Sequence, residues 1–107
     1  MIARLWRGVA SSSAEAEAYQ RHVTTNVFPQ LAAIPGHRGA RVLRRDDSGR
    51  VEFVVMTFWD SMEAIRKFAG DQPETAVVEP EARAVLADYD NFVRHYEIVH
   101  DTDDPAA

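Results

Sequence analysis

The chain has 107 residues, of which 46% are hydrophobic and 27% are charged. These values are typical of one soluble globular domain, so we predict a single domain over residues 1–100 and a flexible acidic tail over 101–107. The net charge of -5 argues against binding to nucleic acid or to an anionic membrane surface. No apolar run reaches the roughly 20 residues of a transmembrane helix, and we expect no cleaved secretory signal. The absence of cysteine excludes disulfides and thiolate chemistry, and it favours a cytoplasmic location.

The first elements are predicted to be a strand over residues 2–9 and a long helix. Ser12 and Glu15 form a capping-box pair at the start of this helix. Its apolar stripe recurs every three or four residues as Tyr19, Val23, Val27, Leu31 and Ile34. Pro29 lacks the N–H that would continue the helical hydrogen bonds, so we predict a kink near residues 26–28.

A hairpin follows the helix. Residues 40–45 and 51–59 are predicted strands, joined by turn-forming residues at 46–49. Both faces of the second strand are largely apolar: Val51, Phe53, Val55, Thr57 and Trp59 on one side, and Glu52, Val54, Met56 and Phe58 on the other. A sheet with two apolar faces needs cover on both, and we predict that a second copy of the chain covers one of them, as a homodimer.

Two further helices and a strand complete the predicted fold. The second helix lies between a cap at Asp60 or Ser61 and a stop at Gly70, and the third begins at Pro80. The apolar face of the third helix would consist of Ala82, Val85, Leu86 and Tyr89. Residues 91–100 are predicted as the last strand. This order indicates an α+β, ferredoxin-like split βαβ sandwich with a four-stranded antiparallel sheet.

Five segments of the chain match the pattern of a known family. They are IARLWRG at 2–8, IPGHRG at 34–39, VLRR at 42–45, TFWDSMEAI at 57–65 and HYE at 95–97. Together they resemble the antibiotic biosynthesis monooxygenase superfamily over essentially residues 1–100. The resemblance implies a dimeric α+β barrel with a small-molecule pocket between sheet and helices in each subunit. Members that act on polyaromatic phenols use O2 without metal or flavin, a separate branch degrades haem, and others have no established activity.

The haem-degrading branch differs from this chain in three places. That branch has an Asn on the first strand, a Trp near the end of the second helix and a haem-ligating His further along. The corresponding stretches here offer Arg4, Trp6 or Arg7, then Phe68, then Val77 and Val78. We therefore predict a cofactor-independent monooxygenase that oxidises a small aromatic or phenolic substrate with O2. The alternatives are a non-catalytic, stress-response type of barrel protein that binds a small hydrophobic ligand and, third, haem degradation.

Oxidising a phenol with O2 needs a base, donors for the developing oxyanion and a dry cavity. The candidate catalytic residues are His95, His22 and Asn26. His95 shares a face of the last strand with Glu97, and its alternative role is that of a half-buried histidine at the dimer interface. Tyr19, His22 and Asn26 follow at helical spacing along the stripe. In the alternative, Tyr19 is a core residue and the other two side chains are solvated.

The candidate substrate contacts are aromatic: Tyr19, Trp6, Trp59, Phe68 and Tyr96. The two tryptophans offer planar surfaces for stacking, although packing in the core or at an interface is their commoner role in a small domain. Arginines recur on the predicted strands at Arg4, Arg7, Arg44 and Arg94. If buried, they need carboxylate partners, for which Glu52 and Glu97 are the candidates. The histidines lack metal-ligand spacing and no phosphate-binding loop is present, so we predict no metal and no cofactor.

Overall fold

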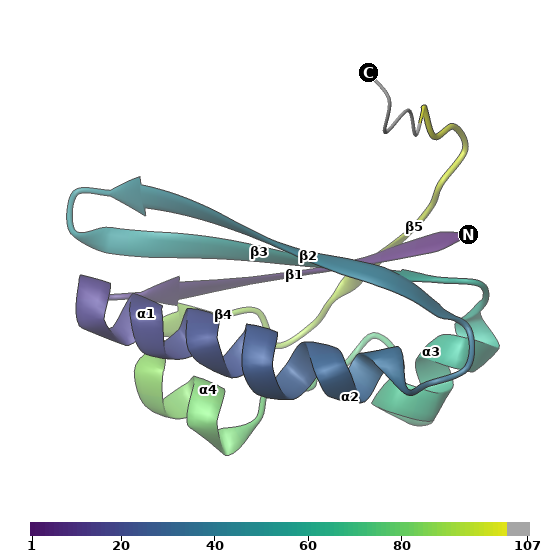
Figure 1. The fold of residues 1–107 in the computed structure, drawn as a ribbon, viewed down its shortest axis with the longest axis horizontal. Coiled ribbons are helices and arrows are strands. Elements are labelled where there is room, and N and C mark those ends of the chain that lie inside the picture. Colours follow the sequence, from purple (N-terminus) through teal and green to yellow (C-terminus); the bar gives the residue numbers. More distant parts are fainter. Residues whose placement is uncertain (103–107) are drawn as a thin grey trace.

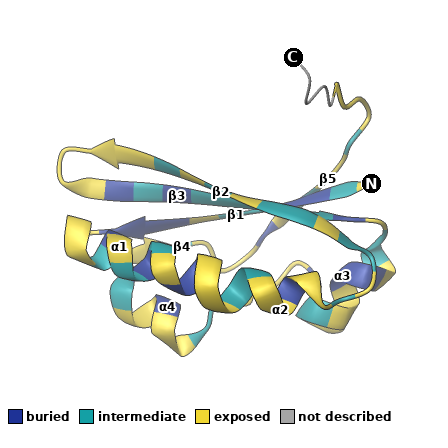
Figure 2. Ribbon diagram, viewed as in Figure 1, coloured by how far each residue is buried: buried dark blue, intermediate teal, exposed yellow. Residues whose placement is uncertain are grey.

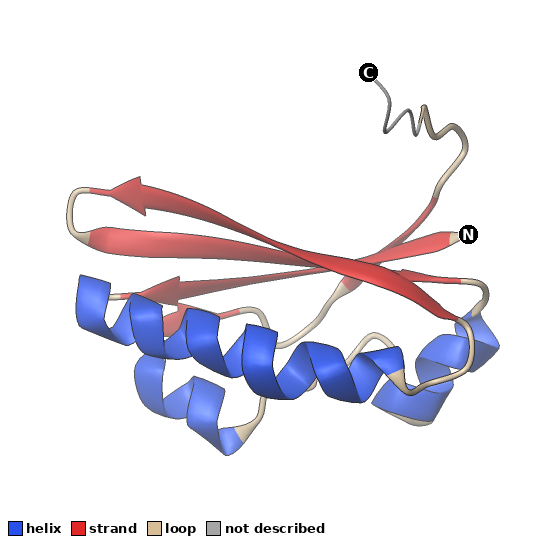
Figure 3. Ribbon diagram, viewed as in Figure 1, coloured by secondary structure: helices blue, strands red, loops and turns tan. Residues whose placement is uncertain are grey.

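The computed structural model describes residues 1–102 and places all the helices on one face of an antiparallel sheet (Figures 1 and 3). The strands are β1 (Ile2–Ala10), β2 (His37–Asp47), β3 (Arg50–Trp59), β4 (Asp88–Tyr89) and β5 (Arg94–Glu97). The helical elements are α1 (Ser13–His22), η1 (Val23–Val27), α2 (Phe28–Ala32), α3 (Met62–Ala69) and α4 (Pro80–Val85). The predicted α+β ferredoxin-like fold is confirmed. Of the predicted acidic tail, residues 103–107 lie outside the described residues.

The sheet has five strands, so the predicted count of four is wrong. Its order is β2-β3-β1-β4, and β5 also pairs with β1. The additional strand is β4, which lies before the predicted last strand and pairs with residues 8–9 of β1. Of the strand predicted over residues 91–100, the part that forms is β5, which pairs with residues 2–5 of β1. Tyr89 belongs to β4 and not to the third helix, because the Ala87 N–H bonds to the Val9 carbonyl at 2.8 Å and draws this segment onto the sheet.

The first helix is continuous through α1, η1 and α2, and η1 is a π-helical turn. The predicted cap is confirmed, since the side chain of Ser12 accepts a hydrogen bond from the Glu15 N–H at 3.2 Å. In η1, the Phe28 N–H bonds to the carbonyl of Val23, five residues back. Pro29 follows at once and has no N–H to offer, which favours a departure from α-helical bonding here. The predicted kink is thus a wide turn that adds one residue to the helix.

The core lies between the helices and one face of the sheet, where the buried residues in Figure 2 gather. On β3, Phe53 and Trp59 are 0% exposed, in agreement with the face predicted for this strand. The opposite face of β3, formed by Glu52, Val54, Met56 and Phe58, is only partly buried. Helices therefore cover one apolar face of the sheet and leave the other open. Over residues 1–102, the helices are all too short or too polar to cross a membrane.

Candidate functional site

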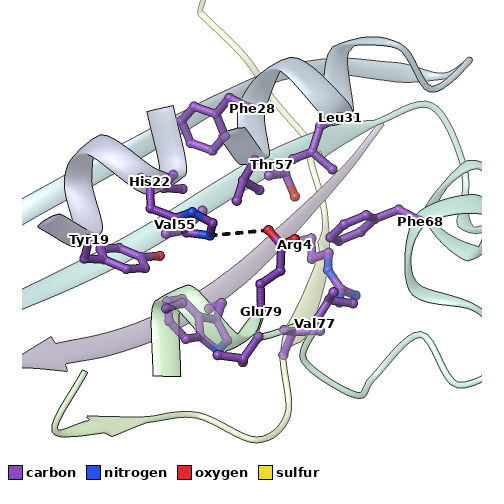
Figure 4. A pocket seen from close by; sticks show the side chains of 16 residues that line it. Arg4, Tyr19, His22, Phe28, Leu31, Val55, Thr57, Phe68, Val77 and Glu79 are labelled. Atoms are coloured by element: carbon purple, nitrogen blue, oxygen red, sulfur yellow. Dashed lines mark ion pairs between the residues drawn. The ribbon is translucent and has the colours of Figure 1, made fainter. Parts of the chain in front are cut away.

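A cavity of about 70 Å³ lies between the first helix and the sheet (Figure 4). A buried water needs roughly 10–15 Å³, so the cavity has room for several waters. β1 and β3 form one wall, and the first helix, α3, α4 and residues 77–79 form the rest. The lining residues are Arg4, Trp6, Tyr19, His22, Val23, Val27, Phe28, Leu31, Val55, Thr57, Phe68, Val77, Val78, Glu79, Ala82 and Val93.

The structure brings half of the predicted site residues to this cavity. Trp6, Tyr19, His22 and Phe68 line it. Asn26 is exposed and reaches the site through a contact with His22. This group comes from β1, α1, η1 and α3, so it assembles only when the helices pack on the sheet.

The remaining predicted site residues lie elsewhere. His95 is on β5, beside Arg4, and does not line the cavity. Trp59 is buried in the core, where its Nε1–H donates to Thr57 Oγ1 at 2.8 Å. Tyr96 lies on the open face of the sheet and is 49% exposed.

His22 is a buried titratable group at the cavity wall, only 8% exposed. Its Nδ1 lies 3.1 Å from Asn26 Nδ2, and its Nε2 lies 3.3 Å from Glu79 Oε1. Because the Asn26 amide N–H donates to Nδ1, the neutral ring carries its proton on Nε2, toward the carboxylate. Nε2 is close to Glu79 but poorly aligned with it, and it remains without a hydrogen bond among the described residues. An imidazole with a nearby carboxylate and an unsatisfied ring nitrogen can accept or release a proton inside the cavity.

Aromatic side chains form the wall beside His22. Tyr19 is 4% exposed and packs on Trp6 and Phe53, with ring centroids 6.0 and 4.9 Å apart. Burial raises the pKa of the Tyr19 phenol far above its ordinary value, so the hydroxyl stays protonated and can donate a hydrogen bond to a ligand. The Trp6 ring is fixed by a hydrogen bond from Nε1–H to the Asp90 carbonyl at 2.8 Å. The site therefore offers rigid aromatic surfaces next to a titratable imidazole.

Arg4 brings a charge to the cavity although it is only 4% exposed. Its guanidinium donates to the carbonyls of Pro73 and Thr75, the latter at 3.2 Å, and lies 2.9 Å from His95 Nε2. Burial lowers the pKa of Arg4 to about 10, which leaves the side chain charged at neutral pH. His95 accepts this hydrogen bond and is therefore neutral, with its proton on Nδ1.

A predicted carboxylate partner is found for one of the strand arginines, because Arg7 pairs with Glu52. Arg44 instead pairs with Glu17 at 2.7 Å and with Asp46 at 3.0 Å, neither of which was predicted. For Arg4 the prediction is wrong, because backbone carbonyls of residues 73 and 75 take the place of a carboxylate. Arg4 as a lining residue, and Glu79 altogether, were missed by sequence reasoning. For Arg4 a signal existed, since it shares a face of β1 with Trp6; for Glu79 the sequence holds none.

Acidification is expected to destabilise the protein through His95. Burial, and then the charge of Arg4, lower the pKa of His95 below its ordinary 6.5, so the unfolded chain takes up the proton first. The stabilisation is complete above pH 6.5 and is lost as the pH falls below it. A His95→Gln variant should lose less of its Tm between pH 7 and pH 5 than the wild type. His37→Gln is a parallel test, because burial also lowers the pKa of His37, and it too should lose less of its Tm than the wild type. An equal fall of Tm with pH in the wild type and in His95→Gln would contradict the prediction.

Comparison with known proteins supports the same architecture. MhuD, a haem degrader from Mycobacterium tuberculosis with two haems bound in its active site, is 16% identical with a TM-score of 0.63, over 96% of this chain and 100% of that one. SnoaB, a cofactor-independent oxygenase from Streptomyces nogalater, is 17% identical with a TM-score of 0.61, over 96% and 97%. A dimeric ferredoxin-like protein from an uncultured marine organism is 13% identical with a TM-score of 0.62, over 97% and 100%. At these identities the likeness establishes the fold alone.

The sequence itself settles the family. No curated protein sequence matches this chain. Residues 11–77, more than half of the 107, match the family described as antibiotic biosynthesis monooxygenase. The matched stretch runs from the start of the first helix, through the hairpin, to the cavity-lining Val77. The chain therefore belongs to the antibiotic biosynthesis monooxygenase family.

Proposed function

We propose that the protein is a cofactor-independent monooxygenase that oxidises a small phenolic substrate in the cavity under the first helix. The observation that carries the proposal is the buried His22, held between Asn26 and Glu79 in the wall of a largely apolar cavity. Family membership supports oxygenase chemistry as the reaction class. SnoaB, which shares the fold, is a cofactor-independent oxygenase.

The first step is removal of the phenolic proton. For this step the Asn26 amide rotates so that its oxygen accepts a hydrogen bond from Nδ1–H, which leaves Nε2 of His22 unprotonated and able to take the phenolic proton. The Glu79 carboxylate and the Asn26 oxygen then stabilise the resulting imidazolium. The aromatic rings of Trp6 and Phe68 bracket the substrate. In this apolar setting, the phenolate is an electron-rich species that is not quenched by water.

The second step is reaction of the phenolate with O2. The substrate supplies the electrons: one oxygen atom enters the ring as a quinone carbonyl, and the other leaves as water together with the two hydrogens lost by the phenol. The charge that develops on oxygen is stabilised by the Tyr19 hydroxyl, which burial keeps protonated.

The cavity does not fit haem well. Among the residues that line it, the one imidazole is His22, and its Nε2 already faces Glu79 at 3.3 Å. The neighbouring Val77 and Val78 offer no metal ligand. Between residues 1 and 102, no cluster of three or more metal-ligating side chains occurs. The proposed steps therefore rely on the side chains of this cavity.

Oxygen uptake tests the proposal. Metal-free protein is incubated with a panel of phenols, hydroquinones and naphthols in an oxygen electrode, and product is followed by quinone absorbance. We expect one O2 consumed for each quinone formed, with no need for added metal, flavin or haem. Tight binding of these phenols without any oxygen uptake would instead identify a ligand-binding protein. Conversion of haem to an open-chain product would favour haem degradation.

We also propose that the open face of the sheet is covered by a second copy of the chain. On this face Leu43 and Tyr96 are 48% and 49% exposed, next to the partly buried Val54, Met56 and Phe58. An apolar surface of this kind on a soluble protein marks an interface, and a stable pair would bury about 1,500 Å² or more. The dimeric ferredoxin-like protein that shares the fold supports this arrangement.

Charges on the open face are expected to separate the subunits. Leu43→Asp combined with Met56→Glu places unpaired carboxylates in the proposed interface, which opposes association. Sedimentation velocity at micromolar concentration should show a dimer for the wild type and a monomer for the variant. Ala14→Asp adds a carboxylate at the exposed start of α1 and should leave the dimer intact. A monomeric wild type would overturn the proposal.

A further inference from the structure

Arg4 is a buried cation without a carboxylate partner. The residue is 4% exposed, and none of the carboxylates described lies within ion-pair distance of it. Glu74 influences the pKa of Arg4 only from beyond that distance. Its contacts are backbone carbonyls, the neutral His95 and the face of the Phe68 ring, whose centroid lies 5.7 Å away. A buried charge in this situation is costly unless a counter-ion is added.

Part of the guanidinium is unused. Nη1 bonds to Pro73 and His95 and Nη2 bonds to Thr75, which leaves the Nε–H and one N–H of Nη2 without a partner in residues 1–102. Because Arg4 lines the cavity, these two unpaired N–H groups are the part of its side chain that a cavity ligand can bind.

The two unpaired N–H groups, on Nε and Nη2, are the pair through which an arginine binds a carboxylate. Elsewhere in this chain, Arg38 holds Asp60 through the same two nitrogens, with Nε at 2.6 Å and Nη2 at 2.7 Å from the carboxylate oxygens. Two parallel N–H groups match the two oxygens of a carboxylate and give a charge-assisted, bidentate contact.

We propose that Arg4 binds a carboxylate of the substrate, so that the cavity takes a phenolic acid. The placement of the phenolic hydroxyl near His22 rests on the proposed function, whereas the carboxylate contact does not. Arg4 and Trp6 are two residues apart on one face of β1, roughly 6.5–7 Å, which is the scale of one aromatic ring. Glu79, whose carboxylate lies 3.3 Å from His22 Nε2, repels a substrate carboxylate from the surroundings of His22. The charges therefore orient the acid toward Arg4 and the hydroxyl toward His22 (Figure 4).

A pair of near-isosteric ligands tests this contact without any turnover. Binding of 4-hydroxybenzoate and 4-hydroxybenzamide is measured by calorimetry at pH 7 under nitrogen. The wild type should bind the acid at least about tenfold more tightly, as expected of a charge-assisted pair. Arg4→Met should reduce this ratio to about one, and Arg4→Lys should keep part of it. Arg38→Met removes an arginine that does not line the cavity and should leave the ratio unchanged.

The outcomes separate this inference from the proposed function. If Arg4→Met fails to fold, the ratio of the affinities for the acid and the amide, measured in the wild type and in Arg4→Lys, still tests the carboxylate contact. Equal binding of acid and amide by the wild type, or a preference for the acid that remains in Arg4→Met, would contradict the carboxylate contact. The role of Arg4 would then be structural, through its hydrogen bonds to the carbonyls of Pro73 and Thr75. A clear preference for the acid with no oxygen uptake would refute the proposed function alone. Turnover of neutral phenols without that preference would refute the carboxylate contact alone.

Discussion

Replacing Trp59 with alanine is expected to lower the free energy of unfolding by about 3–5 kcal/mol. Trp59 is 0% exposed and lies where β3, α3 and the start of β2 meet. Its ring stacks on Phe68 with centroids 6.1 Å apart and meets the edge of His37 at 4.9 Å. Removing it leaves a cavity in the core and an unpaired Thr57 hydroxyl. Urea denaturation followed by circular dichroism measures the change.

The conservative variant Trp59→Phe serves as the control. It keeps a ring between Phe68 and His37 and removes the hydrogen bond to Thr57, so its loss should be clearly smaller. A second control is Trp6→Phe, because Trp6 borders an existing cavity and is only partly buried. If Trp59→Ala lost less than about 1 kcal/mol, the assignment of Trp59 to the core would be wrong.

Replacing His22 with glutamine is expected to lower kcat/KM for phenol oxidation by about 10²–10⁴-fold. Glutamine keeps polar contacts to Asn26 and Glu79 but cannot accept the phenolic proton at neutral pH. The effect should fall mainly on kcat, because the ring contacts from Trp6 and Phe68 remain. Oxygen uptake and anaerobic binding of the same phenol, measured side by side, separate the two parameters.

Two further variants bracket this result. His95→Gln should change kcat/KM little, because His95 lies outside the cavity lining. Asn26→Ala should have an intermediate effect, since Asn26 contacts the imidazole and does not reach into the cavity. Unchanged turnover in His22→Gln would remove His22 from the reaction, and the proposed base with it.

The fold could be predicted because its signals are local. Ser12 with Glu15 fixes the start of the first helix, and the alternation on β3 correctly identifies the face that is buried. The short strand β4 could not be predicted in the same way. It depends on which backbone groups of residues 87–90 reach β1, a long-range contact that leaves no periodic pattern in the sequence.

The residues of the candidate site could be predicted only where helical or strand periodicity places them on the buried face of an element. Tyr19 and His22 follow the stripe of the first helix, and Trp6 follows the alternation of β1. Glu79 reaches the cavity from a segment without regular structure, between α3 and α4, so no helical or strand periodicity predicts its position. The buried state of Arg4 depends on the carbonyls of Pro73 and Thr75, which lie 69 and 71 positions further along the chain.

The wide turn η1 has a consequence for how the first helix tolerates change. Deleting one residue from Val23–Val27 would return the helix to regular α-bonding and rotate one part against the other by roughly 100°. His22 and Phe28, which lie on either side of η1, would then no longer face the same cavity. The spacing between them is therefore set by chain length more than by residue identity. A relative with a different number of residues in this segment would present a different cavity wall, even with both side chains retained.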